Sequence, residues 1–183
     1  MKRAIHALRN FVRRLRDDCG AATVEFALVT GTLVSLMLNG IEIGRYYFIR
    51  MEVQNATQMA VQAVWKICDT ASENPVTVRC SGRTSAITRG LQSTTLGNNV
   101  TLATGYPTEA YYCTSTSTGA LQNVGAVTSA RPADCTAAGS STDIPGNYLI
   151  VRGEYTYAPL FRGITIGTSL PTNIQATSTM RMR

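Results

Sequence analysis

The residue with the most unusual chemistry in this 183-residue chain is Glu25, which lies five residues after Gly20 near the start of an apolar run. A carboxylate is costly to bury in hydrocarbon, so its presence there needs an explanation. A cut after Gly20 would leave a free ammonium on Ala21, one helical turn from Glu25. In a bundle of parallel, staggered copies, Glu25 of one copy could pair with this ammonium of the next and fix the register.

Glu25 also has a simpler interpretation. Near the lipid headgroups its side chain can reach water, and the positive N-terminal end of the helix dipole favours its charge. The sequence leaves both interpretations open.

Cysteines are the second group with chemical potential, and four of the five follow the apolar run. An exported segment enters an oxidising compartment, where an even number of cysteines indicates disulfides. The spacing favours Cys68–Cys80 and Cys113–Cys135, although three pairings are open. Each bond would stabilise the fold by about 3 kcal/mol. A zinc site is disfavoured, because no C-x-x-C pair occurs and the only histidine, His6, precedes the apolar run.

Catalytic groups are scarce beyond Gly20, where the sequence has no histidine and a single lysine, Lys66. This excludes histidine-based acid–base catalysis and the usual Ser-His and Cys-His nucleophiles from that part. A Ser–Lys dyad would need Lys66, which we expect to be a solvated helix residue. We therefore expect no enzyme, no cofactor, no metal site and no small-molecule substrate. Four carboxylates follow residue 73, and nothing in their spacing favours a catalytic hydrolase pair over ordinary surface charges. They are Glu109, Asp134, Asp143 and Glu154.

The net charge of +6 is concentrated at the N-terminus. Six Lys and Arg residues against two Asp residues give 6 − 2 = +4 before Gly20. A nucleic-acid-binding protein would instead carry a basic stripe on its folded domain. Basic residues directly before an apolar run are typical of the cytoplasmic flank of a membrane segment.

The apolar run covers residues 21–43, and its 23 residues would form a helix about 35 Å long, enough to cross a bilayer. The core of a secretory signal is shorter, and no clean A-x-A site follows. Apolar residues then recur at steps of three and four up to Ile67. We therefore expect one helix over residues 21–70, whose outer half is amphipathic and packs on the chain's own C-terminal part.

The sequence after residue 72 predicts an exported, β-rich domain, which we call the head. Strands are expected at residues 76–80, 100–104, 110–115, 147–157 and 174–182, and a short helix near residues 86–91. Residues 114–146 are predicted to form a long loop. Residues 159–161 and 163–170 are predicted to form a turn and a short strand. The expected fold is α+β, with the outer half of the long helix packed against a small antiparallel sheet. The expected parts are a basic leader (1–20), a membrane half-helix (21–43), an outer half-helix (44–72) and the head (73–183).

Two stretches carry a resemblance to a known family. Gly20 followed by AATVEFAL, after a basic leader, resembles the start of type IV prepilins and pseudopilins. Together with the later NGIEIGR stretch at residues 39–45, it is more similar to the TadE-like family of the tight-adherence (Tad/Flp) pilus system. The YTYAPLF stretch at residues 155–161 and the last strand also resemble the tail of that family.

The resemblance implies a minor pilin or pseudopilin that helps to assemble or prime an adhesive pilus. Gly20 and Ala21 would flank a prepilin-peptidase cut, and Glu25 with Phe26 would serve assembly and register. The implied location is the bacterial inner membrane, crossed once, with a cytoplasmic N-terminus and a periplasmic head. The implied partners are other pilins, the inner-membrane assembly platform and the peptidase. The family motif would comprise Gly40, Glu42, Gly44 and Arg45.

The alternative is a membrane-anchored periplasmic binding or adhesion domain that never enters a filament. In that case Glu25 would be merely interfacial.

Overall fold

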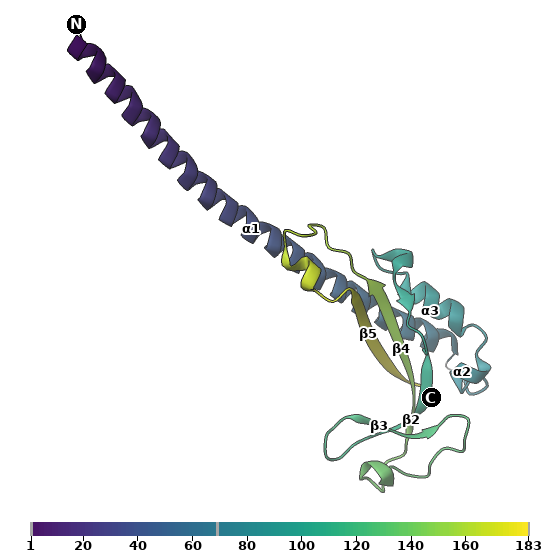
Figure 1. Cartoon of the computed structure of the whole chain (residues 1–183). Helices are drawn as coiled ribbons and strands as arrows, with labels where there is room; N and C mark the ends of the chain where they lie inside the picture. The colour runs from purple at the N-terminus through teal and green to yellow at the C-terminus, as the bar shows by residue number, and fades with distance from the viewer. Residues whose placement is uncertain (1, 69, 183) are drawn as a thin grey trace. The chain divides into compact units, whose positions relative to one another are not determined.

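The structure is a computed structural model that describes residues 2–68 and 70–182, with side chains described from Gly20 onward. It combines one long helix with a five-stranded antiparallel sheet, which confirms the predicted α+β fold (Figure 1). The helices are α1 (Lys2–Cys68), α2 (Val76–Arg79) and α3 (Arg83–Leu91), with 3-10 turns η1 (Gly97–Asn99), η2 (Thr136–Ala138) and η3 (Ile166–Ser169). The strands are β1 (Thr101–Leu102), β2 (Thr108–Thr114), β3 (Leu121–Ala126), β4 (Gly146–Thr156) and β5 (Asn173–Met182).

The chain forms two compact units. The first, the stem unit, comprises the chain up to Arg45 together with Pro159–Leu170. The second, the head unit, comprises Tyr46–Ala158 and the chain from Pro171 on.

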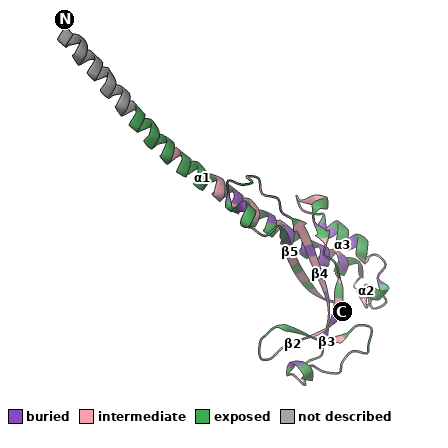
Figure 2. Ribbon diagram, viewed as in Figure 1, coloured by how far each residue is buried: buried purple, intermediate pink, exposed green. Residues whose placement is uncertain are grey.

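Helix α1 starts well before the predicted residue 21, since it includes the basic leader from Lys2. The leader contains Ala, Leu, Arg and Lys, which favour helices, and no proline or glycine interrupts it before Gly20. From Gly20 to Met37 its side chains are almost all exposed, as Figure 2 shows. Phe26 is 72% exposed and Leu28 69%. Helix α1 thus contains a stretch that is long and apolar enough to cross a membrane.

The outer part of α1 provides one side of the core of the head unit. Its buried residues recur at steps of three and four, as the sequence predicts for an amphipathic helix; they are Ile49, Val53, Ala56, Ala60, Val64 and Cys68. Residues from α3 and β4 complete the core; they are Ala86, Ile87, Leu91, Leu149 and Val151.

Two glycines let α3 and β4 approach α1 closely. A Cβ at Gly90 in α3 would lie 2.3 Å from the Cα of Ala60. A Cβ at Gly153 in β4 would lie 2.7 Å from Oγ1 of Thr57. Any side chain at these positions would push the elements apart.

Strand β4 organises the sheet, because it pairs with β1, β2 and β5. It pairs with β5 along nearly its whole length, from Asn147 opposite Met182 to Thr156 opposite Asn173. Strand β2 continues the sheet to β3, with a register shift between Tyr111 and Tyr112. The predicted strands at residues 110–115, 147–157 and 174–182 are confirmed, as is the helix near residues 86–91.

Three local predictions were wrong, and a fourth, the strand at residues 100–104, was confirmed only in part. Residues 76–79 form helix α2 instead of a strand; the segment is short and starts directly after Pro75, which suits a first helical turn. Strand β3 lies within the expected 114–146 loop, where its LQNVGA sequence has no clear alternation. Strand β1 covers only two residues of the expected 100–104. The turn η3 replaces the short strand expected within residues 163–170.

Both expected disulfides are present, Cys68–Cys80 and Cys113–Cys135, and all four cysteines are buried. The first ties the end of α1 to the residue after α2. The second ties β2 to the residue before η2, within a small separate cluster that contains Ala138 and Val124. Because this cluster has few apolar residues, the disulfide is its main cross-link.

Candidate assembly site on the apolar helix

The carboxylate of Glu42 is buried, although the helix around it is largely exposed. Glu42 has 0% exposure, whereas the preceding residue, Ile41, is 54% exposed. The backbone N–H of Leu160 donates to its two oxygens at 3.3 and 3.1 Å, and that of Phe161 donates to one of them at 3.3 Å. Nη1 of Arg45, one turn further on, lies 4.0 Å from Oε1. These donors and the guanidinium offset the cost of burying the charge.

Asn39 binds the same part of the chain. Its Oδ1 accepts a hydrogen bond from the N–H of Ile166 at 2.9 Å. Its Nδ2 donates to the carbonyl of Ser35 one turn earlier, at 2.8 Å. The two polar interruptions at the end of the apolar run, Asn39 and Glu42, therefore both hold Pro159–Leu170, which we call the clasp segment.

Two residues of the clasp segment complete this arrangement. A Cβ at Gly167 would lie 2.8 Å from Cγ of Glu42 and 2.9 Å from Cβ of Pro159, so only glycine fits there. The hydroxyl of Thr165, 7% exposed, donates to the carbonyl of Phe161 and accepts from the N–H of Gly167. Sequence reasoning missed both residues. The only signal was the resemblance of residues 155–161 to a family tail, which does not indicate a contact with the helix.

The predicted processing and register residues lie on the exposed part of α1. Glu25 makes no hydrogen bond or ion pair with another described residue, and its neighbour Phe26 is exposed. A Cβ at Gly20 would have no atom within 4 Å outside its own helix backbone and chain neighbours. The roles of Gly20, Ala21, Glu25 and Phe26 remain predictions.

The motif residues divide into two groups. Glu42 and Arg45 face each other within the stem unit. Gly40 and Gly44 instead contact nothing, since a Cβ at either position would have no atom within 4 Å outside the local helix. The fold of the described chain therefore does not require glycine at residues 40 and 44.

The carboxylates of the head unit accept hydrogen bonds from neighbouring groups of the same unit where the structure shows a partner. Glu109 accepts hydrogen bonds from the N–H groups of Val76 and Thr77, at 3.0 and 2.7 Å, and from Nδ2 of Asn147 at 2.6 Å. It thereby joins α2 to the sheet.

Asp134 accepts hydrogen bonds from the hydroxyl and N–H of Thr136, which lower the pKa of Asp134 below its ordinary value. Glu154 pairs with Gln175, and Asp143 is exposed. No hydrogen bond joins any two of these four described carboxylates. Among the described residues, no group of three or more His, Cys, Asp or Glu side chains could hold a metal ion.

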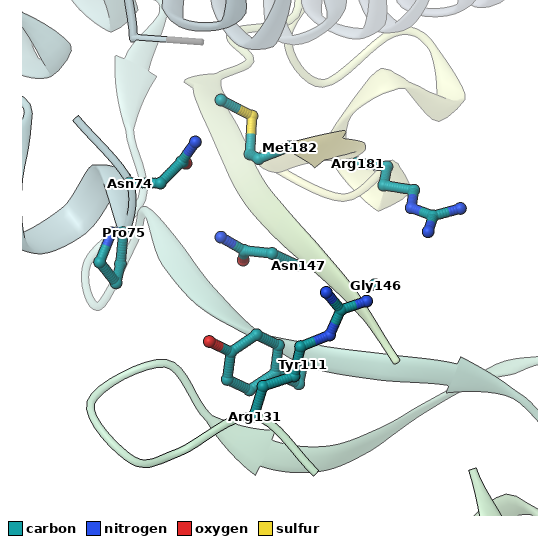
Figure 3. A pocket seen from close by; sticks show the side chains of 8 residues that line it. All are labelled: Asn74, Pro75, Tyr111, Arg131, Gly146, Asn147, Arg181 and Met182. Carbon is teal, nitrogen blue, oxygen red and sulfur yellow. The ribbon is translucent and has the colours of Figure 1, made fainter. Parts of the chain in front are cut away.

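The head unit also has an open cavity of about 490 Å³ between the β2–β4 region and the segment before α2 (Figure 3). Arg131 and Arg181 line it, together with Tyr111 and Asn147. Neither arginine has an ion pair with a described residue. The cavity offers hydrogen-bond donors, but its lining includes no carboxylate, thiol or imidazole that could act as a general base.

One comparison with known proteins identifies a family. Residues 20–62 match the model of the family described as TadE-like protein. This segment is TadE-like. The match confirms the predicted family, and it includes Glu25, Phe26 and the whole motif at residues 40–45. No curated protein and no solved structure matches the chain.

Proposed function

We propose that this chain is a minor pilin or pseudopilin that takes part in the assembly or priming of a Tad/Flp pilus. The observation that carries the proposal is the TadE-like segment, which begins at Gly20 and includes Glu25. We further propose that the role is structural and that the chain is not an enzyme. The local structural use of the head carboxylates supports this.

The contrast between Glu25 and Glu42, the two glutamates in or at the end of the apolar run of α1, supports an intermolecular role for Glu25. Glu42 is buried and fully engaged by groups of its own chain. Glu25 has no partner among the described residues and lies in an exposed apolar stretch. In lipid or within a helix bundle, such a carboxylate needs a cationic partner. The ammonium of Ala21 in a neighbouring, processed copy would supply it.

The membrane topology follows from the charge pattern. Residues 21–43 would cross the bacterial inner membrane once, with the basic leader in the cytoplasm and the head in the periplasm. The two disulfides of the head unit fit an oxidising compartment. The partners would be other pilins, the assembly platform and, for the cut after Gly20, the prepilin peptidase.

Co-purification tests the assembly role. A tagged chain is extracted from cells in mild detergent, and the accompanying pilins are quantified for the wild type and for Glu25→Ala. We expect the substitution to remove most of the associated pilins. Glu154→Ala, which removes a half-buried carboxylate from β4, is the matched control and should leave them unchanged. Equal recovery of pilins with Glu25→Ala and wild type would contradict the proposal.

The N-terminus tests processing separately. Mass spectrometry of the membrane-extracted protein should find a chain that begins at Ala21 in cells with the prepilin peptidase. It should find the longer precursor in cells without it. A chain beginning at Met1 in both would rule out the cut, though not the anchor.

The cavity of Figure 3 favours a second candidate, an anchored periplasmic binding or adhesion domain. Its two arginines, which have no ion pair with a described residue, would attract an anionic group. This role predicts that Arg131→Ala with Arg181→Ala abolishes surface attachment while pilin co-purification stays normal. The assembly role instead predicts that Glu25→Ala reduces pilin co-purification and that the two arginine substitutions leave it unchanged.

A further inference from the structure

The clasp segment exposes an unusual share of aliphatic side chains. Leu160 is 57% exposed, Ile164 67% and Ile166 49%. Between them lies the exposed Arg162, and the segment contains no acidic residue. Exposed apolar side chains gathered on one short segment indicate a surface that meets another apolar phase.

The structure fixes the position of this segment along α1. The hydrogen bonds from Leu160 and Phe161 to Glu42, and from Ile166 to Asn39, hold it at the last turn of the apolar run. A hydrocarbon core of about 30 Å takes about 20 helical residues. If the span starts at Ala21, as in the proposed function on which this inference rests, residues 39–42 lie where the helix leaves the hydrocarbon.

Five backbone N–H groups of the clasp segment are also hydrogen-bonded to protein. A loop at the edge of the hydrocarbon is tolerated only when its polar backbone groups are satisfied by protein. The N–H groups of Leu160, Phe161 and Ile166 bind the helix side chains named above. The N–H of Gly167 binds the hydroxyl of Thr165, and that of Leu170 binds the carbonyl of Gly167. This explains why an otherwise apolar helix carries Asn39 and Glu42 one turn apart.

We propose that the clasp segment is a second membrane contact, which inserts Leu160, Ile164 and Ile166 into the interfacial layer of the bilayer that holds α1. The guanidinium of Arg162 would bind lipid phosphate, and the lack of acidic residues avoids repulsion from it. We favour lipid over protein as the partner of these exposed side chains, because the clasp segment is hydrogen-bonded to the end of the stretch that is long enough to cross the membrane. The contact would set the depth and rotation of α1 in the membrane.

Tryptophan fluorescence in vesicles tests the proposal. The full chain, with Trp65→Phe to remove its single tryptophan, is reconstituted into phosphatidylethanolamine–phosphatidylglycerol vesicles. One tryptophan is then introduced by Ile164→Trp, a substitution at an exposed site that should not disturb folding. Lipids brominated near the top of the acyl chain quench indoles at the interface. We expect quenching several-fold stronger than that of Val78→Trp. The anchor control Leu33→Trp lies about 18 Å along the helix from Ala21, near the bilayer centre, so it is measured with lipids brominated deep in the acyl chain.

The two control sites separate this inference from the anchor. Leu33 lies within the apolar run, and Val78 is an exposed apolar residue of the head unit. Quenching at Leu33→Trp without quenching at Ile164→Trp would overturn the lipid contact and leave the anchor intact. No quenching at Leu33→Trp would contradict the anchor as well. Blue-shifted but unquenched emission from Ile164→Trp would show that protein, such as a second copy, covers the segment, and would also overturn the proposal.

Discussion

Gly167 lies directly against the side chain of Glu42, since a Cβ at Gly167 would lie 2.8 Å from Cγ and 3.0 Å from Cδ of that residue. The glutamate of the TadE-like motif therefore has a role within its own chain, where it holds the clasp segment on the apolar helix. Glu42 and Glu25 therefore have different surroundings within the same helix. Glu42 is hydrogen-bonded within its own chain, whereas Glu25 has no hydrogen bond or ion pair with a described residue.

Replacing Gly167 by alanine should loosen the clasp segment. The added methyl group would overlap Glu42 and Pro159, and such overpacking costs about 1–3 kcal/mol. Limited proteolysis in detergent should cut within residues 159–170 faster than in the wild type. Gly44→Ala is the matched control, because it adds the same methyl group to the stem unit where nothing lies within 4 Å. Equal cutting rates in the two variants would contradict the geometry.

Glu42→Ala should expose the backbone amides that the carboxylate now binds. Hydrogen bonds to a charged acceptor contribute about 1.5–3 kcal/mol each, and two N–H groups would lose their partner. Hydrogen exchange at Leu160 and Phe161 should accelerate strongly in Glu42→Ala and less in Glu42→Gln, which retains one acceptor oxygen. Glu25→Gln should leave both amides unchanged. If Glu42→Ala leaves their protection intact, the carboxylate does not hold the segment.

Alanine at Gly40 and Gly44 should separate folding from assembly. Neither glycine is needed for space within the chain, and each replacement should favour the helix by about 1 kcal/mol. Thermal unfolding of the purified double variant should therefore show unchanged or higher stability. A loss of pilin co-purification in the same variant would place these glycines at a close contact between copies. Destabilisation of the isolated protein would show that the chain itself uses them.

The two disulfides should each stabilise the head unit by about 3 kcal/mol, for loops of 12 and 22 residues. Paired serine substitutions, Cys68→Ser with Cys80→Ser or Cys113→Ser with Cys135→Ser, should lower the unfolding free energy accordingly. Denatured, unreduced protein should bind no thiol label beyond Gly20. Two labelled thiols there would mean that a bond is missing from the protein as made in the cell.

The fold was predictable where a long periodic pattern existed. The spacing of Ile49, Val53 and Ala56 marked the buried face of α1, and the apolar run in residues 147–157 marked the central strand β4. Short segments were predicted wrongly. At Val76–Arg79, the alternation of apolar and polar residues over four positions is compatible with a strand and with one helical turn. Strand β3 was missed because its polar LQNVGA sequence is specified by pairing with β2 rather than by its own pattern.

The candidate site was half predictable. Sequence singled out Glu42 as part of a motif, yet its donors are backbone N–H groups 118 and 119 residues away. Backbone groups carry no sequence signal, so neither the clasp segment nor the need for Gly167 could be inferred. The chemistry of Glu25 was visible at once, since a lone carboxylate in an apolar run stands out from its neighbours.

The most direct test of the account is pilus output in the bacterium that encodes this chain. Pili are sheared from cells that lack the chain and from the same cells supplied with the wild type, Glu25→Ala or Glu154→Ala, and the shed pilin is quantified. We predict that the wild type and Glu154→Ala restore pili, whereas cells without the chain and cells with Glu25→Ala release little or none. Full pilus output from cells that lack the chain would contradict the assembly role.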